Sequence, residues 1–130
     1  MKARKVMLLI VAMTVSICTF AEETAKPFVE TLLSTAPEHI AGNDVLVTRA
    51  TFPANFSLPK HFHPVEEYAY VLEGEIRLKI DGEIEKVCKS GDFAFIPAQR
   101  IHSANTGDAP ATLLIYRIQP QGQPIMITVD

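Results

Sequence analysis

The stretch HFHPVEEYAYVLEG, residues 61–74, places two of the chain's four histidines two positions apart and follows them with a pair of glutamates and a glycine. Side chains alternate between the two faces of a β-strand, so His61 and His63 point to one face and Phe62 to the other. Two imidazoles on one face can bind the same metal ion. We therefore predict a metal site on this strand.

The rest of the chain consists largely of short apolar or alternating runs separated by turn residues, a pattern typical of β-strands. Asp81-Gly82 predicts a tight hairpin turn. Residues 28–35 fit either a short helix or an edge strand. Many short strands at close spacing predict an all-β fold, as an antiparallel sandwich or barrel. The runs predicted as strands are 45–52, 67–72, 75–80, 83–88, 92–96, 112–118 and 125–129.

The first 21 residues have the three parts of a secretory signal. Three basic residues among the first five are followed by an apolar run of twelve residues, and the segment ends at the small residue Ala21. A membrane anchor would need about 20 apolar residues to span the bilayer. We therefore predict cleavage after Ala21, a periplasmic or secreted location, and no membrane partner after cleavage.

Removal of that segment would leave nine basic against fifteen acidic residues, a formal net charge of −6. An acidic chain of this kind argues against a nucleic-acid partner. Cys88 would be the one remaining cysteine, so no internal disulfide is expected. A lone cysteine on a strand is predicted to be a small buried side chain, with intermolecular pairing as the alternative.

A second stretch, GDFAFIPAQRIH (91–102), ends in a third histidine, His102. Together with His61, His63 and a glutamate from the first stretch, it completes a candidate set of imidazoles and one carboxylate. Such a set suits one divalent transition metal, Fe, Mn, Ni, Co, Cu or Zn, better than Ca or Mg. His39 lies in a polar stretch and is interpreted as a surface residue.

In these two stretches the chain resembles the cupin superfamily, whose small single-domain members form a double-stranded β-helix, or jelly-roll, barrel. Asn55 and Gln99 stand where the motifs have glycine, and Asn105 comes one residue early. The resemblance covers about residues 44–118. Together with the signal pattern, it divides the chain into a signal peptide at 1–21, an N-terminal segment at 22–43 (edge strand or short helix) and a cupin β-barrel at 44–130. The residues that match the two motifs are His61, His63, Glu67 and Gly74, then Gly91, Pro97 and His102.

The spacing of the resemblance favours Glu67 over Glu66 as the carboxylate ligand. With Glu67 facing inward, Ala69 and Val71 also face the interior, and these small side chains leave room for a ligand beside the metal. The predicted metal ligands are therefore His61, His63, Glu67 and His102. Glu67 is also the predicted catalytic residue, as a proton acceptor when it leaves the metal.

Four protein ligands leave one or two open positions on the metal, where a substrate oxygen or dioxygen can bind. The resemblance implies dioxygenases, isomerases and decarboxylases as well as non-catalytic binding proteins. We expect a metal-dependent oxidoreductase of dioxygenase type that acts on a small oxygenated organic molecule. The alternatives are a non-catalytic module that binds a metal or small ligand, and a metal-dependent isomerase or decarboxylase.

The end segments 28–35 and 125–129 lie beyond the two-motif core and predict a homodimer, because exposed edge strands invite pairing. Tyr68, Tyr70 and Leu72 would face away from Glu67 and add an aromatic surface to that contact. The alternating Phe93 and Phe95 are predicted to be core residues.

Overall fold

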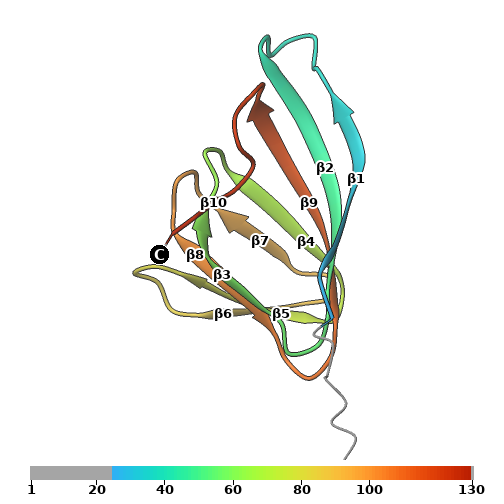
Figure 1. Ribbon diagram of the computed structural model, residues 1–130, viewed down its shortest axis with the longest axis vertical. Helices are drawn as coiled ribbons and strands as arrows, with labels where there is room; N and C mark the ends of the chain where they lie inside the picture. The colour runs from blue at the N-terminus through green and yellow to red at the C-terminus, as the bar shows by residue number, and fades with distance from the viewer. Residues whose placement is uncertain (1–24, 130) are drawn as a thin grey trace, which may run out of the picture.

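The computed structural model describes residues 25–129, and the predicted signal segment lies outside this range. The described residues form two five-stranded antiparallel sheets that face each other (Figure 1). The first sheet has the order β1-β2-β9-β4-β7: β1 (Phe28–Thr35), β2 (Asn43–Phe52), β9 (Ala111–Pro120), β4 (Glu67–Glu73) and β7 (Phe93–Ile96). The second has the order β10-β3-β8-β5-β6: β10 (Ile127–Thr128), β3 (Ser57–Phe62), β8 (His102–Thr106), β5 (Glu75–Ile80) and β6 (Lys86–Lys89). The predicted all-β jelly-roll fold is confirmed.

The long strands β1, β2 and β9 extend past the other strands at one end, while both sheets converge at the opposite end (Figure 1). Burial alternates along β4, where Glu67, Ala69 and Val71 are buried and Tyr68 and Leu72 are exposed. This is the alternation that the inward-facing Glu67 predicted. The enclosed core lies between the two sheets and consists mainly of aliphatic side chains: Ala50, Phe52, Ala69, Val71, Ile76, Leu78, Ile80, Cys88, Ala94, Ile96, Ala104, Ala111, Leu113 and Ile115.

Residues 28–35 form an edge strand rather than a helix, since β1 pairs antiparallel with β2. The short β10 pairs with β3 of its own barrel. Both end segments therefore have partners within the chain. The described residues include no helix long and apolar enough to cross a membrane.

Two expectations about local structure were wrong. Phe93 and Phe95 are 71% and 51% exposed, because Ala94 and Ile96 take the inward positions of β7. The Asp81-Gly82 turn is not a two-residue hairpin with both residues at positive φ. Only Gly82 has positive φ (+85°), and five residues separate β5 from β6.

The two motif positions that lack glycine keep a glycine-like backbone. Asn55 and Gln99 have φ of 55° and 61°, in the left-handed region that residues with a Cβ adopt at a cost. Gly74 has φ of +79°, which favours glycine, and it is also required for a steric reason. A Cβ there would lie 2.3 Å from the Pro110 carbonyl oxygen, so no larger residue fits.

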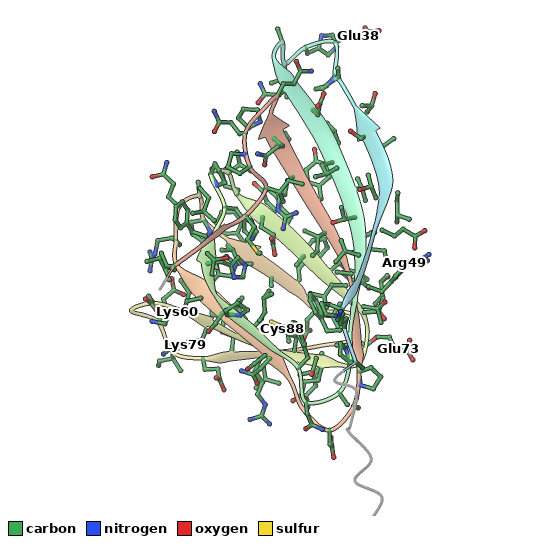
Figure 2. The ribbon with its side chains drawn as sticks, viewed as in Figure 1. Glu38, Arg49, Lys60, Glu73, Lys79 and Cys88 are labelled. Atoms are coloured by element: carbon green, nitrogen blue, oxygen red, sulfur yellow. The ribbon has the colours of Figure 1, made fainter. Side chains whose placement is uncertain are left out.

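Cys88 lies between the sheets and is 6% exposed, as predicted for a small buried side chain, while charged residues such as Glu38, Lys60 and Glu73 lie on the outside (Figure 2). Burial raises the pKa of the Cys88 thiol and keeps it protonated at neutral pH. This favours a packing role for Cys88 over intermolecular pairing.

Candidate metal centre

The histidines of the two motifs come together at one place in the barrel. His61 lies near the end of β3, His63 directly follows that strand, and His102 begins β8. In the antiparallel β3–β8 ladder His61 and His102 are directly paired. Strand alternation places His63 on the same face as His61. Residues about 40 positions apart in the chain are thus juxtaposed by one strand pairing.

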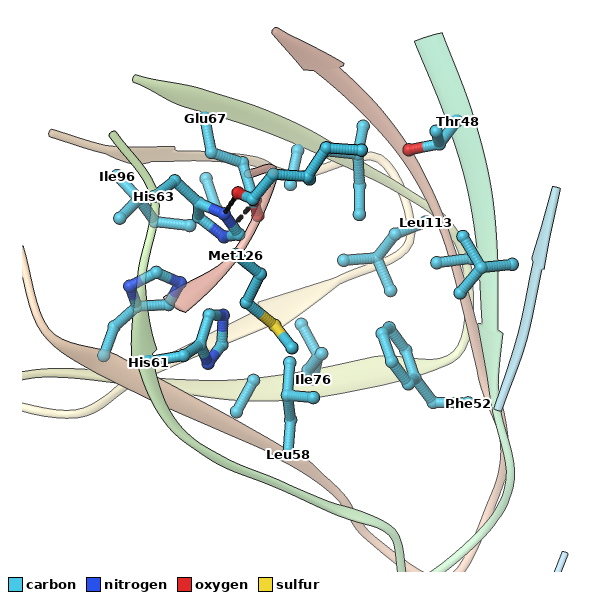
Figure 3. A pocket seen from close by; sticks show the side chains of 18 of the residues that line it. Thr48, Phe52, Leu58, His61, His63, Glu67, Ile76, Ile96, Leu113 and Met126 are labelled. Atoms are coloured by element: carbon cyan, nitrogen blue, oxygen red, sulfur yellow. Dashed lines mark hydrogen bonds and ion pairs between the residues drawn. The ribbon is translucent and has the colours of Figure 1, made fainter. Parts of the chain in front are cut away.

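One ring nitrogen from each of His61, His63 and His102 lies within 4.8 Å of the other two, and all three side chains are buried. We call these three residues the histidine triad. Their rings are at most 4% exposed, and the His61 and His102 ring centroids are 4.2 Å apart. Figure 3 shows His61 and His63 on the same wall of the cavity.

Backbone carbonyl groups orient every ring of the triad. The Nδ1 atoms of His61 and His102 lie 2.8 and 2.9 Å from the carbonyl oxygens of Pro59 and Arg100, and His63 Nδ1 lies 2.5 Å from that of Ile125. A carbonyl oxygen can only accept a hydrogen bond, so Nδ1 is the donor in each case. The Nε2 atoms are left to bind a cation, which is the arrangement that metal-ligating histidines require.

The electrostatics of the triad also suit a metal. Burial lowers the pKa of His61 to about 4, and burial likewise lowers the pKa of His102. Both imidazoles are therefore neutral at pH 7, as a metal ligand must be. The residues present thus fit a transition metal ion.

Glu67 lies beside the triad. It is 7% exposed, and its Oε2 atom is 2.8 Å from His63 Nε2, although Glu67 is outside the group whose ligand atoms all lie within 4.8 Å. Two atoms that offer lone pairs at this separation need a cation between them, either a proton or a metal ion. Glu66 is exposed and faces away.

Arg117 of β9 forms a buried ion pair with Glu67 through Nη2, and the same Nη2 is 3.5 Å from His63 Nε2. Burial by itself would raise the pKa of Glu67, but the hydrogen bonds and charges of His63 and Arg117 lower it to about 2. A carboxylate held ionised in this way is a weak base. This favours a role for Glu67 as a ligand or fixed charge over the predicted role as proton acceptor.

Our sequence reasoning missed Arg117. A signal for it existed, because Arg117 occupies the same face of its strand as the buried Leu113 and Ile115. An arginine on the inward face of a strand almost always has a buried partner. The sequence does not show which acid that partner is.

The triad and the ion pair open into a cavity of about 380 Å³ between the sheets. Its other walls are largely apolar and include Phe52, Leu58, Ile76 and Met126 (Figure 3). A cavity of this size holds a small organic molecule next to the metal position.

A family model described as a cupin domain matches residues 48–116, more than half of the chain. The protein therefore belongs to the cupin family. Among curated proteins, the dimethylsulfoniopropionate lyase DddQ of Ruegeria pomeroyi is 31% identical over 75 residues, which cover 57% of this chain and 37% of the lyase.

Solved structures show the same fold. The crystal structure of the lyase DddQ from Ruegeria pomeroyi aligns with a TM-score of 0.68 at 21% identity, over 86% of this chain and 56% of that one. A cupin-like protein from Thermotoga maritima aligns with a TM-score of 0.63 at 21% identity, over 79% and 75% of the two chains. This chain spans less than two thirds of the lyase it matches.

Proposed function

We propose that this cupin is an exported metal-dependent enzyme that acts on a small oxygenated organic molecule inside the barrel. The observation that carries the proposal is the buried histidine triad, in which a backbone carbonyl orients each ring at Nδ1 and one ring nitrogen of each residue lies within 4.8 Å of the other two. Surface histidines have no reason to adopt this arrangement. Export rests on the predicted signal at residues 1–21.

The reaction that we favour is oxidation of dioxygenase type. A redox metal at the triad would supply open positions for dioxygen and a substrate oxygen. The protein side chains would hold the substrate, exclude water and keep the imidazoles neutral. The case for this reaction over proton abstraction is that Glu67, the one carboxylate lining the cavity among the described residues, is already paired with Arg117.

A lyase reaction is the second candidate, and the similarity to a dimethylsulfoniopropionate lyase favours it. It needs no dioxygen, whereas the first reaction consumes it. Glu67 would have to accept a proton despite its pairing with Arg117.

The test begins with metal analysis of the protein purified from its exported compartment, which is expected to contain one transition metal ion per chain. Turnover of a panel of phenols, enols and small carboxylic acids is then measured with and without dioxygen. Oxygen-dependent turnover supports the dioxygenase, and turnover unaffected by oxygen removal supports the lyase. Bound metal without turnover on any compound would contradict both and leave a binding module.

The predicted homodimer has support from the outer face of the first sheet. Tyr68 packs against Phe95 with ring centroids 5.3 Å apart, and Tyr70 packs against Phe93 at 5.1 Å. Exposed aromatic clusters of this kind are typical of interfaces. We expect sedimentation equilibrium to give twice the chain mass, and the Phe93→Ser/Phe95→Ser variant to give a monomer that still binds metal. A monomeric parent protein contradicts the proposal.

A further inference from the structure

The buried ion pair of Glu67 and Arg117 indicates which kind of molecule the proposed enzyme binds in its cavity. The inference rests on the proposed function, because it concerns the ligand of the same site. Glu67 and Arg117 are the one acid and the one Lys or Arg among the described residues that line the cavity. Their charges cancel, so the pair as a whole adds no net charge to the site.

Arg117 has donor capacity that the protein does not use. Its side chain is 7% exposed, its Nη2 contacts Glu67, and its Nε–H has no hydrogen-bond partner among residues 25–129. A guanidinium group carries five N–H donors in a planar fork that matches a carboxylate. Buried donors are almost always paired in native proteins. The unpaired Nε–H of Arg117 therefore indicates an acceptor that a ligand would bring.

The charge count leads to the same conclusion. Histidines that coordinate a metal are neutral. With Glu67 cancelled by Arg117, a divalent ion at the triad would bring two positive charges that the described cavity residues leave uncompensated. Buried charge of this size needs a counter-charge. An anionic ligand would supply it.

The other walls of the cavity exclude a positive charge on the same ligand. They are formed mainly by aliphatic side chains, among them Leu58, Ile76 and Leu113 (Figure 3). Phe52 is the one aromatic ring apart from the imidazoles that the described residues place there. A cation held against these walls would lose its hydration without gaining an acidic partner or an aromatic cage.

We propose that the cavity binds a small carboxylate with an uncharged apolar remainder, and that the carboxylate lies beside the histidine triad, within reach of the Arg117 guanidinium group. Dimethylsulfoniopropionate, which the name of the similar lyase gives, combines a carboxylate with a sulfonium cation. By this reasoning, the cavity discriminates against that cation while it accepts the carboxylate.

Three probes of nearly the same shape test the negative and the positive charge of the ligand separately. They are dimethylsulfoniopropionate, 4-methylpentanoate and 4-methylpentanamide. 4-Methylpentanoate replaces the sulfonium sulfur of dimethylsulfoniopropionate by a CH group, and 4-methylpentanamide also removes the negative charge. Binding of each probe is measured by isothermal titration calorimetry to the metal-free and the Zn²⁺-loaded protein. We expect 4-methylpentanoate to bind about tenfold more tightly than 4-methylpentanamide, because a hydrogen bond to a charged group contributes at least this factor. We also expect it to bind more tightly than dimethylsulfoniopropionate, because the sulfonium group would lose its hydration without gaining an acidic partner.

Variants of the ion pair test the role of Arg117. Arg117→Lys keeps the charge but loses the planar fork, and it is expected to weaken 4-methylpentanoate binding while amide binding stays unchanged. The Glu67→Leu/Arg117→Met variant replaces the pair by apolar side chains, so it avoids a buried unpaired carboxylate. In the metal-free form of this variant, the preference for carboxylate over amide should disappear. The control Arg49→Met removes an exposed arginine on the strand next to β9 and should leave the preference intact.

The experiment tests the preference for a carboxylate independently of Zn²⁺ binding. Equal binding of carboxylate and amide, or tighter binding of dimethylsulfoniopropionate than of 4-methylpentanoate, would overturn the inference even in a protein that binds Zn²⁺. Failure to bind Zn²⁺ with the carboxylate preference retained would overturn the proposed metal enzyme and leave the anion site. An Arg117→Lys variant with full preference would show that the guanidinium geometry has no role.

Discussion

The sheet that contains β3 and β8 carries His61 and His102, and His63 follows β3 directly, whereas the opposite sheet contributes Glu67 from β4 and Arg117 from β9. The histidines are oriented by backbone carbonyls in an arrangement that can bind a cation. Both members of the ion pair are charged at neutral pH, so they act electrostatically on that cation and its ligand. The histidine triad and the ion pair thus come from different sheets and meet at His63, whose Nε2 is 2.8 Å from Glu67 Oε2.

The largest expected effect comes from breaking the buried ion pair of Glu67 and Arg117. Arg117→Met leaves Glu67 buried without its cation, so the free energy of unfolding of the metal-free protein should fall by about 3–5 kcal/mol in urea denaturation. The Glu67→Leu/Arg117→Met variant should recover most of this loss. Arg49→Met, which breaks an exposed pair with Glu30 at 2.8 Å, should cost less than about 1 kcal/mol. Similar losses in the two single variants would contradict a special role for the buried pair.

The histidine triad is tested by removing one imidazole. Structural zinc sites with four ligands gain roughly 10–16 kcal/mol on binding, so one ligand corresponds to about 3 kcal/mol, or roughly a 100-fold loss of affinity. His102→Ala should show this loss in Zn²⁺ titrations with a competing chelator. His39→Ala, at an exposed position, is the matched control. If the two variants bind Zn²⁺ equally, the site lies elsewhere.

Mild acid should reduce the stability of the metal-free protein through His61 at a higher pH than through Glu67. The pKa of His61 is lowered from 6.5 to about 4, so the unfolded chain binds the additional proton between these values and stability falls as the pH drops through that window. The loss due to His61 is about 3 kcal/mol. Glu67, whose pKa is also lowered, begins to lose its contribution only below pH 4.5. His61→Gln should reduce the loss between pH 6.5 and 4 in urea denaturation, and an unchanged pH profile would contradict the assignment.

The smallest expected effect concerns the turn at Gln99, which contacts the backbone of His63. Gln99 has φ of 61°, and its backbone N–H donates to the His63 carbonyl oxygen at 2.8 Å. Gln99→Gly should raise the free energy of unfolding by about 1 kcal/mol or less, because glycine adopts this conformation without strain but loses more entropy on folding. Asn55→Gly should gain less, since asparagine tolerates the left-handed region. A clear loss of stability in thermal unfolding of the Gln99→Gly variant would show that its side chain makes a needed contact.

Sequence patterns were sufficient for the fold and for much of the histidine triad. Alternation of apolar residues predicted most of the strands, and the spacing of the cupin motif predicted the inward direction of Glu67. Strand β8 was missed because its residues, HSANT, are mostly small and polar. Phe93 and Phe95 were misassigned because large aromatic residues are usually buried, whereas here the other face of the strand meets the cavity.

What the sequence by itself determined is local. His61 and His63 share a face because strands alternate, and the carbonyl groups that orient His61 and His102 belong to residues only two positions earlier, Pro59 and Arg100. The tertiary structure alone decided the contacts between distant residues. It brings Arg117 to Glu67 across 50 positions and the Ile125 carbonyl to His63 across 62, because the pairing of β4 with β9 and the return of the chain end across the barrel set them side by side. Periodicity fixes the face on which a side chain lies, but the residue opposite that face depends on the order of the strands in the sheets.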